Sequence, residues 1–244
     1  MKILSIGNSF SCDAQRYLYE IAKADGVSLD TFNLNIGGCP LSRHYRNMLS
    51  EEKAYHLEMN GRGTGFFVSL KEALLSREWD VITIQQVSHL APNYDTYQPY
   101  LDKLCEYIRT HAPKAKLALQ QTWAYEQDSK RLNEELGYTD YKDMLADIKK
   151  AYATAAKRIK ADFVIPSGEV FAALLQNGIE KIHRDTFHAS LGVGRYTLAL
   201  LWYKVLTGNS VVDNKFRDFD AEVPENEIAV AKKCVETVAK KHKF

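Results

Sequence analysis

A serine, a histidine and an aspartate in this sequence have the types and spacing of a nucleophile, a base and the carboxylate that orients the base. Ser9 follows a short apolar run and a glycine in the stretch KILSIGNSFS, residues 2–11. Asp185 and His188 share the segment HRDTFH, residues 183–188. At that spacing the carboxylate can bind imidazole Nδ1–H, which leaves Nε2 free to take a proton from a serine hydroxyl. Serine needs such a base because its hydroxyl is scarcely ionised at neutral pH.

The surroundings of Ser9 permit two roles. The sequence predicts a buried strand before it, a glycine turn, and a helix after it, with apolar or small residues at helical spacing. Ser9 would then stand at the carboxyl end of a strand, where open α/β sheets bind ligands. It would also stand at a helix amino terminus, where free N–H groups stabilise negative charge. In the alternative interpretation, Ser9 or Ser11 only caps the helix.

A second turn could supply backbone donors. Gly37 and Gly38 follow the strand expected at residues 29–36, and Pro40 stiffens the loop after them. The N–H groups of Ser9 and Gly38 could together form an oxyanion hole, which holds the negative oxygen of a tetrahedral intermediate.

The elements that position these residues alternate along the chain. Apolar runs predict five strands, and the intervening segments predict helices; the strands are expected at 3–6, 29–36, 79–84, 116–119 and 161–166, and the helices at 42–54, 70–75, 97–110, 138–159, 169–175, 191–206 and after Pro224. This order predicts a three-layer α/β/α sandwich with a five-stranded parallel sheet and right-handed crossovers. We expect one domain over residues 1–244. The polar segment 55–65 predicts a short surface hairpin.

The bulk composition excludes several classes of protein. A net charge of +1 over 244 residues gives no signal for nucleic acid or an anionic membrane. The four cysteines are widely spaced and form no CxxC, so we expect neither a zinc site nor disulfides. No apolar stretch is long enough to span a bilayer. The chain as given is expected in the cytoplasm, or in the periplasm or outside the cell if a signal peptide was removed before Lys2.

The ordered set of motifs resembles the SGNH (GDSL-like) hydrolases, which are lipases and esterases on a flavodoxin-like fold. In that family G-D-S ends strand one, a glycine follows strand two, G-x-N-D follows strand three, and D-x-x-H lies near the carboxyl end. The resemblance runs from Gly7 to beyond His188, with a bacterial branch that has a GNSFS first block and is thought to include carbohydrate esterases. It implies that Ser9 is the nucleophile, His188 the general base, Asp185 its orienter and Gly38 an oxyanion donor, with no cofactor.

The sequence departs from the family pattern in two places. Asn8 replaces the usual aspartate, which is a nearly isosteric change. Gln85, Gln86 and Ser88 stand where the G-x-N-D block is expected, so the asparagine that completes the oxyanion hole is missing. Gln85 or Gln86 could supply a side-chain amide in its place. Loss of one such donor costs on the order of 100-fold in rate.

Further residues are expected to line the same crevice if the strand ends meet there. Two Gln-Gln pairs leave neighbouring strands, and polar or aromatic residues follow each of them. The expected substrate-binding residues are Asn8, Ser88, His89, Gln121 and Trp123, with Tyr125 beside them. Trp123 could stack on a sugar ring, or it could be a lid or core residue.

Three functional hypotheses follow. The first is a serine esterase that cleaves short acyl esters, such as O-acetyl groups on carbohydrate, through an acyl-enzyme and without a cofactor. Its partner would be a small-molecule or carbohydrate ester. The second is a non-catalytic carbohydrate-binding protein on the same fold, which the missing asparagine motivates. The third is a metal-dependent hydrolase that uses His183, Asp185 and His188 as ligands.

Overall fold

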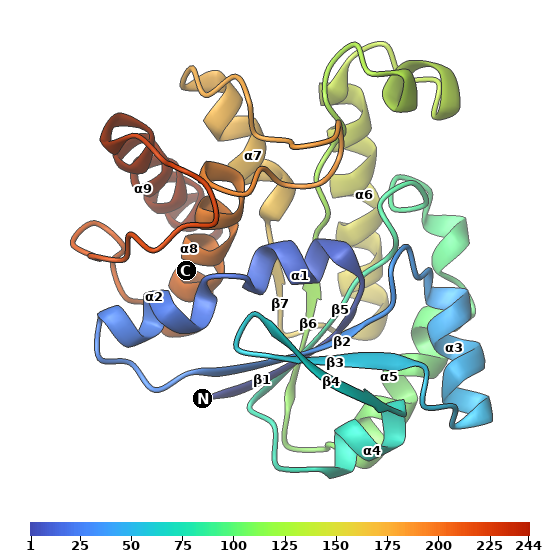
Figure 1. Ribbon diagram of the computed structural model, residues 1–244. Coiled ribbons are helices and arrows are strands. Elements are labelled where there is room, and N and C mark those ends of the chain that lie inside the picture. The colour runs from blue at the N-terminus through green and yellow to red at the C-terminus, as the bar shows by residue number, and fades with distance from the viewer.

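A computed structural model describes residues 1–244, and its centre is a seven-stranded sheet with helices on both faces (Figure 1). The strand order across the sheet is β4-β3-β2-β1-β5-β6-β7. The strands are β1 (Lys2–Gly7), β2 (Asp30–Asn35), β3 (Tyr55–Met59), β4 (Arg62–Val68), β5 (Val81–Ile84), β6 (Lys116–Gln120) and β7 (Phe163–Ile165).

The five predicted strands are all present, and they are parallel to one another. β1 pairs with β2 and β5, and β6 joins β5 to β7. Counted among these five strands alone, the spatial order is 2-1-3-4-5, which is the flavodoxin-like order. The prediction of an α/β/α sandwich is therefore confirmed.

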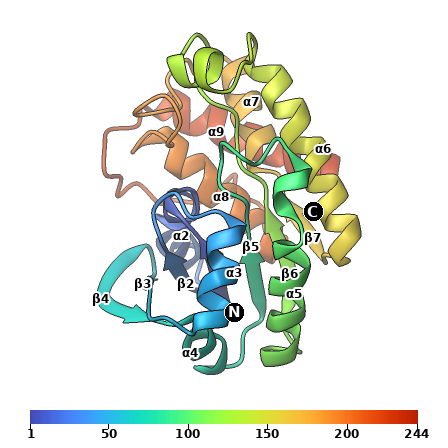
Figure 2. The same cartoon turned by 90° about the vertical axis from the view of Figure 1, so that its right-hand side faces the viewer.

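The prediction of five strands was too low, because the 55–65 hairpin joins the sheet. β3 pairs antiparallel with β2, placing Leu57 opposite Leu34, and β4 pairs antiparallel with β3. Tyr55 is fully buried at the start of β3, so its side chain anchors the hairpin in the core. The polar composition of the segment gave no sign that it belongs to the sheet. The hairpin covers the edge of β2 and moves the open edge of the sheet to β4 (Figure 2).

The helices form two layers, one on each side of the sheet (Figures 1 and 2). One layer holds α1 (Ser9–Gln15), α2 (Leu18–Ala24), α7 (Ser167–Gln176), α8 (Val193–Thr207) and α9 (Glu225–His242), and the other holds α3 (Leu41–Ser50), α4 (Leu70–Leu75), α5 (Tyr100–His111) and α6 (Tyr141–Ile159). α8 contacts α1, α2, α7 and α9. It is buried over the whole run from Tyr196 to Tyr203, as expected for a helix that is apolar on most sides.

The helix expected after β1 is broken into α1 and α2 at Arg16 and Tyr17. The break lets the fully buried Tyr17 reach the far segment of the chain that leads into and out of α8. Its hydroxyl donates to the carbonyl of Leu191 at 2.5 Å and accepts from the N–H of Asp220 at 2.7 Å. The short α1 is thereby fixed against the loops around α8.

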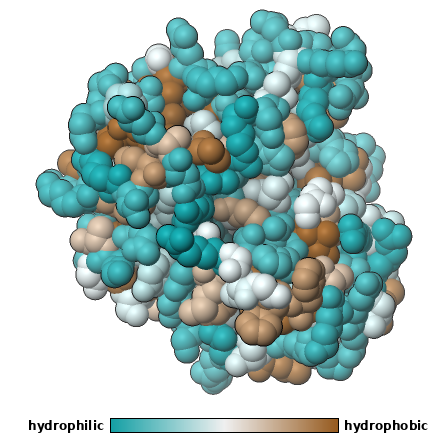
Figure 3. Space-filling view, viewed as in Figure 1, coloured by the Kyte–Doolittle hydropathy of each residue, from teal (hydrophilic) through white to brown (hydrophobic).

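The register of the parallel strands brings their carboxyl ends together. Gly7 lies opposite Asn35, and Ile84 lies opposite both Ile6 and Leu119. The segments that follow β1, β2, β5 and β6 therefore leave the sheet at one edge, as the sequence predicted for the site. Hydrophilic residues cover most of the face drawn in Figure 3, and apolar residues show there in separate patches. No helix is both long and apolar enough to cross a membrane.

Candidate active site

Ser9, His188 and Asp185 form one chain of hydrogen bonds. The Oγ of Ser9 lies 2.8 Å from Nε2 of His188, and Nδ1 of His188 lies 2.7 Å from Oδ2 of Asp185. The backbone N–H of His188 also donates to Oδ1 of Asp185 at 2.9 Å. Both carboxylate oxygens of Asp185 therefore bind His188, whose ring faces the hydroxyl of Ser9. Burial raises the pKa of Asp185, but its hydrogen bonds with His188 outweigh this and leave the pKa lowered.

The helix cap is provided by Asn8 and not by Ser9. The side chain of Asn8 accepts from the N–H of Phe10 at 3.0 Å, and the hydroxyl of Ser11 accepts from the N–H of Asn8 at 3.1 Å. These two contacts satisfy the amino terminus of α1. The hydroxyl of Ser9 is left free for His188, so the alternative interpretation applies to its neighbours and not to Ser9.

The turn after β2 presents the second backbone donor. Gly38 has a φ of +61°, in the left-handed region that glycine adopts at little cost. Its N–H donates to no backbone acceptor. Asn8 ties this turn to α1, since its Nδ2 donates to the carbonyl of Cys39 at 3.2 Å. Ser9 is the first residue of α1, so its N–H has no acceptor within the helix. The two expected oxyanion donors thus belong to segments joined through Asn8.

The two glutamines after β5 are used within the protein. Gln85 Nε2 donates to Oδ1 of Asn8 at 2.7 Å, and its own Oε1 is buried without a partner. Gln86 accepts from the N–H groups of Leu41 and Val87, at 3.0 and 2.9 Å. Its amide nitrogen donates to the carbonyl and hydroxyl of Thr96 at 3.0 and 3.1 Å. The expectation that Gln86 donates to an oxyanion is therefore wrong in this geometry, and Gln85 instead orients Asn8.

Of the two alternatives for Trp123, the structure shows the core residue and not the sugar-stacking platform, because this side chain has no exposed surface. Its expected place among the substrate-binding residues is therefore wrong. Its ring stacks on Phe10 with centroids 4.0 Å apart, and Nε1 donates to the carbonyl of Phe187 at 2.8 Å. Trp123 therefore packs between the residue after Ser9 and the residue before His188. It supports the segments that carry Ser9 and His188 and cannot stack on a sugar ring.

The remaining expected crevice residues divide into buried and exposed ones. Ser88 and Tyr125 are buried, and their hydroxyls are 2.8 Å apart. Gln121 is 4% exposed, with its Oε1 buried and unpartnered. His89 is exposed, in the turn that follows β5, and partial burial of its ring lowers its pKa. Of this set, His89 is the residue open to a ligand.

A residue that the sequence did not single out holds the two halves of the site together. Asp13 in α1 is fully buried, and its carboxylate accepts from Arg184 at 2.9 and 3.0 Å and from Arg195 at 2.9 Å. It also accepts from the N–H of Ala189 at 3.1 Å. The helix that carries Ser9 therefore binds both flanks of the loop that carries Asp185 and His188. The one signal in the sequence is an acidic residue inside an apolar helix, and that does not identify its partners.

The three residues proposed as metal ligands do not form one group, although Asp185 and His188 are hydrogen-bonded to each other. His183 is 3% exposed, and its Nε2 donates to the carbonyl of Ala124 at 3.1 Å. Burial lowers its pKa to about 4, which keeps the ring neutral. Over residues 1–244, no three His, Cys, Asp or Glu side chains are grouped so that they could hold a metal ion. The metal-dependent hypothesis therefore has no ligand set in this structure.

Comparison with known proteins places this geometry in a family. Residues 2–238 match the sequence profile described as "Domain of unknown function (DUF4886)". The crystal structure of a DUF4886 family protein from Bacteroides uniformis ATCC 8492 is 30% identical, with a TM-score of 0.90. The match covers 98% of this chain and 95% of that one. Among curated protein sequences there is no match.

More distant structures share the fold. A candidate SGNH hydrolase from Slackia heliotrinireducens is 22% identical with a TM-score of 0.60, and the match covers 84% of this chain and 98% of that one. A candidate GDSL-like lipase from Parabacteroides merdae ATCC 43184 is 15% identical with a TM-score of 0.56, over 85% and 95% of the two chains. The fold is thus that of the SGNH hydrolases, as the motifs indicated.

Proposed function

This chain belongs to the DUF4886 family and has the fold of the SGNH hydrolases, and we propose that it is a serine esterase for short acyl esters. The observation that carries the proposal is the continuous hydrogen-bonded chain from Asp185 through His188 to Ser9. This is the arrangement in which an imidazole can deprotonate a serine hydroxyl while a carboxylate fixes its tautomer.

The reaction proceeds in two halves. The Oγ of Ser9 attacks the ester carbonyl carbon while Nε2 of His188 takes the hydroxyl proton, and Asp185 stabilises the imidazolium that forms. The C–O bond to the alcohol then breaks, the alcohol leaves with the proton from His188, and an acyl group remains on Ser9. Water, deprotonated by His188, attacks the acyl carbon, and the acid is released as Ser9 regains its proton.

Two backbone groups serve as the oxyanion hole in this proposal. The N–H groups of Ser9 and Gly38 donate to no backbone acceptor within the protein. Donors of this kind act on the charge that develops in the transition state. The side chains of Gln85 and Gln86 position the surrounding loops instead.

The exposure of the site bears on the substrate. The side chain of Asp185 is 47% exposed and that of His188 is 17% exposed, so the catalytic residues lie at the surface and not in a closed pocket. An open site can act on a small acyl group that is attached to a large alcohol. We therefore propose O-acetyl groups on carbohydrate as the natural substrate class, following the branch of hydrolases that the GNSFS block resembles.

The alternative of a non-catalytic carbohydrate-binding protein is less well supported. It was motivated by the missing asparagine together with Trp123 and Tyr125, which could have formed a sugar-binding platform. Trp123 is fully buried and Tyr125 is 2% exposed, so neither ring offers a free face.

The test is covalent labelling together with turnover. Wild type, Ser9→Ala and the exposed control Ser28→Ala are treated with a fluorophosphonate and assayed with 4-nitrophenyl acetate, with and without a chelator. We expect labelling and chelator-insensitive turnover in wild type and Ser28→Ala, and neither in Ser9→Ala. Turnover that persists in Ser9→Ala, or the absence of labelling in wild type, would overturn the proposal.

A further inference from the structure

We propose that the site includes a subsite for an anionic group of the substrate, formed by the guanidinium of Arg131 beside His188. This inference rests on the proposed esterase function and adds a substrate class to it. The esters concerned carry a carboxylate, sulfate or phosphate on either the acyl or the alcohol side.

Arg131 lies in the segment between β6 and α6, which is next to the loop that carries His188. It begins a one-turn π-helix, Arg131–Glu135, between β6 and α6. This connection and the loop that carries His188 lie side by side in the upper part of Figure 1, joined by a 2.7 Å hydrogen bond from the N–H of Glu126 to the carbonyl of Thr186. Residues from two distant parts of the chain therefore form one wall of the site.

The guanidinium lies close to the catalytic base. The Cζ of Arg131 is 4.1 Å from the ring centroid of Phe187, and that ring is 3.9 Å from the ring of His188. These distances place the positive charge within about 8 Å of the imidazole, close enough to act on a charged group of a bound ester. The contact with Phe187 also restrains the long side chain, which reduces the entropy lost when a ligand binds.

The charge of Arg131 is available to a ligand. Arg131 is exposed and forms no ion pair with a carboxylate, in contrast with Arg184 and Arg195, which share the buried Asp13. A free guanidinium presents a planar set of N–H donors that matches the oxygens of a carboxylate, sulfate or phosphate.

The neighbouring groups are mostly hydrogen-bond donors. The hydroxyls of Tyr125 and Ser88 form a pair, and His89 lies close enough to Arg131 for the guanidinium, after burial, to lower its pKa. Glu135, in the same π-helix, carries an opposing charge: it raises the pKa of His89 and forms no ion pair with Arg131. The carboxylate of Asp185 is a second negative charge, and it is hydrogen-bonded to His188. Removal of Glu135 should therefore strengthen the subsite, whereas removal of Arg131 should abolish it.

The test compares matched anionic and neutral esters. One pair places the charge on the acyl side, mono-4-nitrophenyl succinate against 4-nitrophenyl butyrate. The other places it on the alcohol side, 4-acetoxybenzoate against its methyl ester. The measured quantity is the ratio of kcat/KM for the anionic ester to kcat/KM for the neutral ester, for each pair and each variant.

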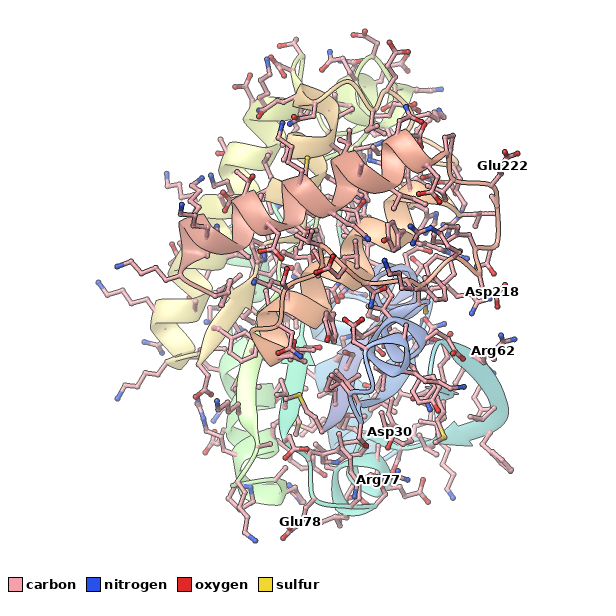
Figure 4. The ribbon with its side chains drawn as sticks, turned by 90° about the vertical axis from the view of Figure 1, so that its left-hand side faces the viewer. Asp30, Arg62, Arg77, Glu78, Asp218 and Glu222 are labelled. Atoms are coloured by element: carbon pink, nitrogen blue, oxygen red, sulfur yellow. The ribbon has the colours of Figure 1, made fainter.

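The control variant removes the same charge at a distant place. Arg62 is on the β3–β4 hairpin, labelled in Figure 4, and its strand position lies beside Met59, which pairs with Phe32 near the amino end of β2. The site is at the opposite, carboxyl end of the parallel strands. Arg62→Gln therefore controls for the change in net charge.

We expect Arg131→Gln to lower the ratio for at least one pair by roughly five- to tenfold, as fits one partly exposed charge contact. Arg131→Lys keeps the charge but not the planar donor set and should retain part of the ratio, Glu135→Gln should raise it, and Arg62→Gln should leave it unchanged. Added salt should lower the ratio in wild type but not in Arg131→Gln. The pair that responds identifies the side of the ester that carries the charge.

Two outcomes overturn the inference, and they are distinct. Ser9-dependent turnover with ratios that do not change in Arg131→Gln removes the anionic subsite and leaves the esterase proposal intact. Absence of Ser9-dependent turnover of all four esters removes the esterase proposal and the subsite with it.

Discussion

The buried carboxylate of Asp13 accepts hydrogen bonds from Arg184 at 2.9 and 3.0 Å, and so joins the helix that carries Ser9 to the residue next to Asp185. Asp13 is one helical turn after Ser9 in α1, with three residues between them. Ala189, which follows His188 directly, donates to Oδ2 of the same carboxylate. An ion pair outside the proposed catalytic triad therefore joins the segments that carry Ser9 and His188.

Asp13→Asn should damage both stability and catalysis. The amide has one oxygen where three donor groups converge, so Arg184 loses its charged partner and Arg195 retains only Asp220, at a cost of about 1–3 kcal/mol. Without the full set of hydrogen bonds to Asp13, the loop of His188 is held less firmly against Ser9. We expect a lower thermal midpoint and, at a temperature where the variant is folded, a kcat reduced by at least roughly tenfold with KM little changed.

Asp220→Asn is the matched control for Asp13→Asn. Asp220 pairs with Arg16 and Arg195 but does not contact the loop of His188. It should lower the midpoint less and preserve kcat. Wild-type kcat in folded Asp13→Asn would show that the base loop is positioned by other contacts.

Gln85→Ala and Gln86→Ala should have different effects. Gln85 orients Asn8, so its removal should lower kcat through the loops on both sides of the oxyanion. Gln86 links the start of α3 to Thr96, so its removal should lower the free energy of unfolding by about 1–3 kcal/mol and change kcat only a few-fold. Kinetics and urea denaturation of both variants separate the two roles. A loss of 100-fold or more in kcat for Gln86→Ala would instead identify an oxyanion donor.

Asn8→Asp, which restores the residue usual in the SGNH pattern, should impair this protein. The Nδ2 of Asn8 donates to the carbonyl of Cys39, and a carboxylate oxygen in its place would face that carbonyl. The cap to Phe10 and the contact with Gln85 use Oδ1 and would survive. We expect a stability loss of about 1–3 kcal/mol at neutral pH.

The same variant should recover on acidification, because a protonated carboxyl can again donate to Cys39. The ratio of variant to wild-type activity should therefore rise as the pH falls from 8 to 5. A ratio that is flat or falls over this range would rule out the contact with Cys39 as the cause.

Two buried histidines should make the fold acid-sensitive. Burial, with a further contribution from Arg43, lowers the pKa of His44 from 6.5 to about 3, and burial lowers that of His183 to about 4. Below pH 6.5 the unfolded chain takes up protons that the folded protein does not, so stability falls as the pH falls. Each histidine adds a slope of about 1.4 kcal/mol per pH unit between about 6 and 4.

Denaturant unfolding at pH 7.5, 6 and 5 measures this slope. His183→Gln, which retains a donor for the carbonyl of Ala124, should flatten it. Equal unfolding free energies at the three pH values would contradict the assignment of neutral, buried imidazoles.

The fold and the three proposed catalytic residues could be predicted because both depend on local patterns. Continuous apolar runs identify parallel strands that are buried on both faces, and strand ends locate the loops that follow them. Asp185 and His188 are close in sequence, so their contact follows from spacing alone. Ser9 and His188 are far apart in the chain, and their contact could be predicted because the order of the motifs resembles that of a known family.

The errors concern contacts between distant segments. Nothing near Gln86 shows that Thr96 will bind its amide, and nothing near Trp123 shows that Phe10 will cover its ring. The role of Asp13 depends on Arg184 and Arg195, which lie far along the chain. The sequence therefore indicates which segments meet at the site, whereas the packing there decides which side chains remain free.

The separation of these partners along the chain has a consequence during synthesis. Ser9 and Asp13 leave the ribosome first, whereas the base and the two arginines that match the buried carboxylate come from residues 184–195. A nascent chain that ends before this region has a nucleophile without a base and a core carboxylate without its counterions. It cannot cleave esters by the proposed route, and the active site is assembled only when the last third of the polypeptide folds onto the first helix.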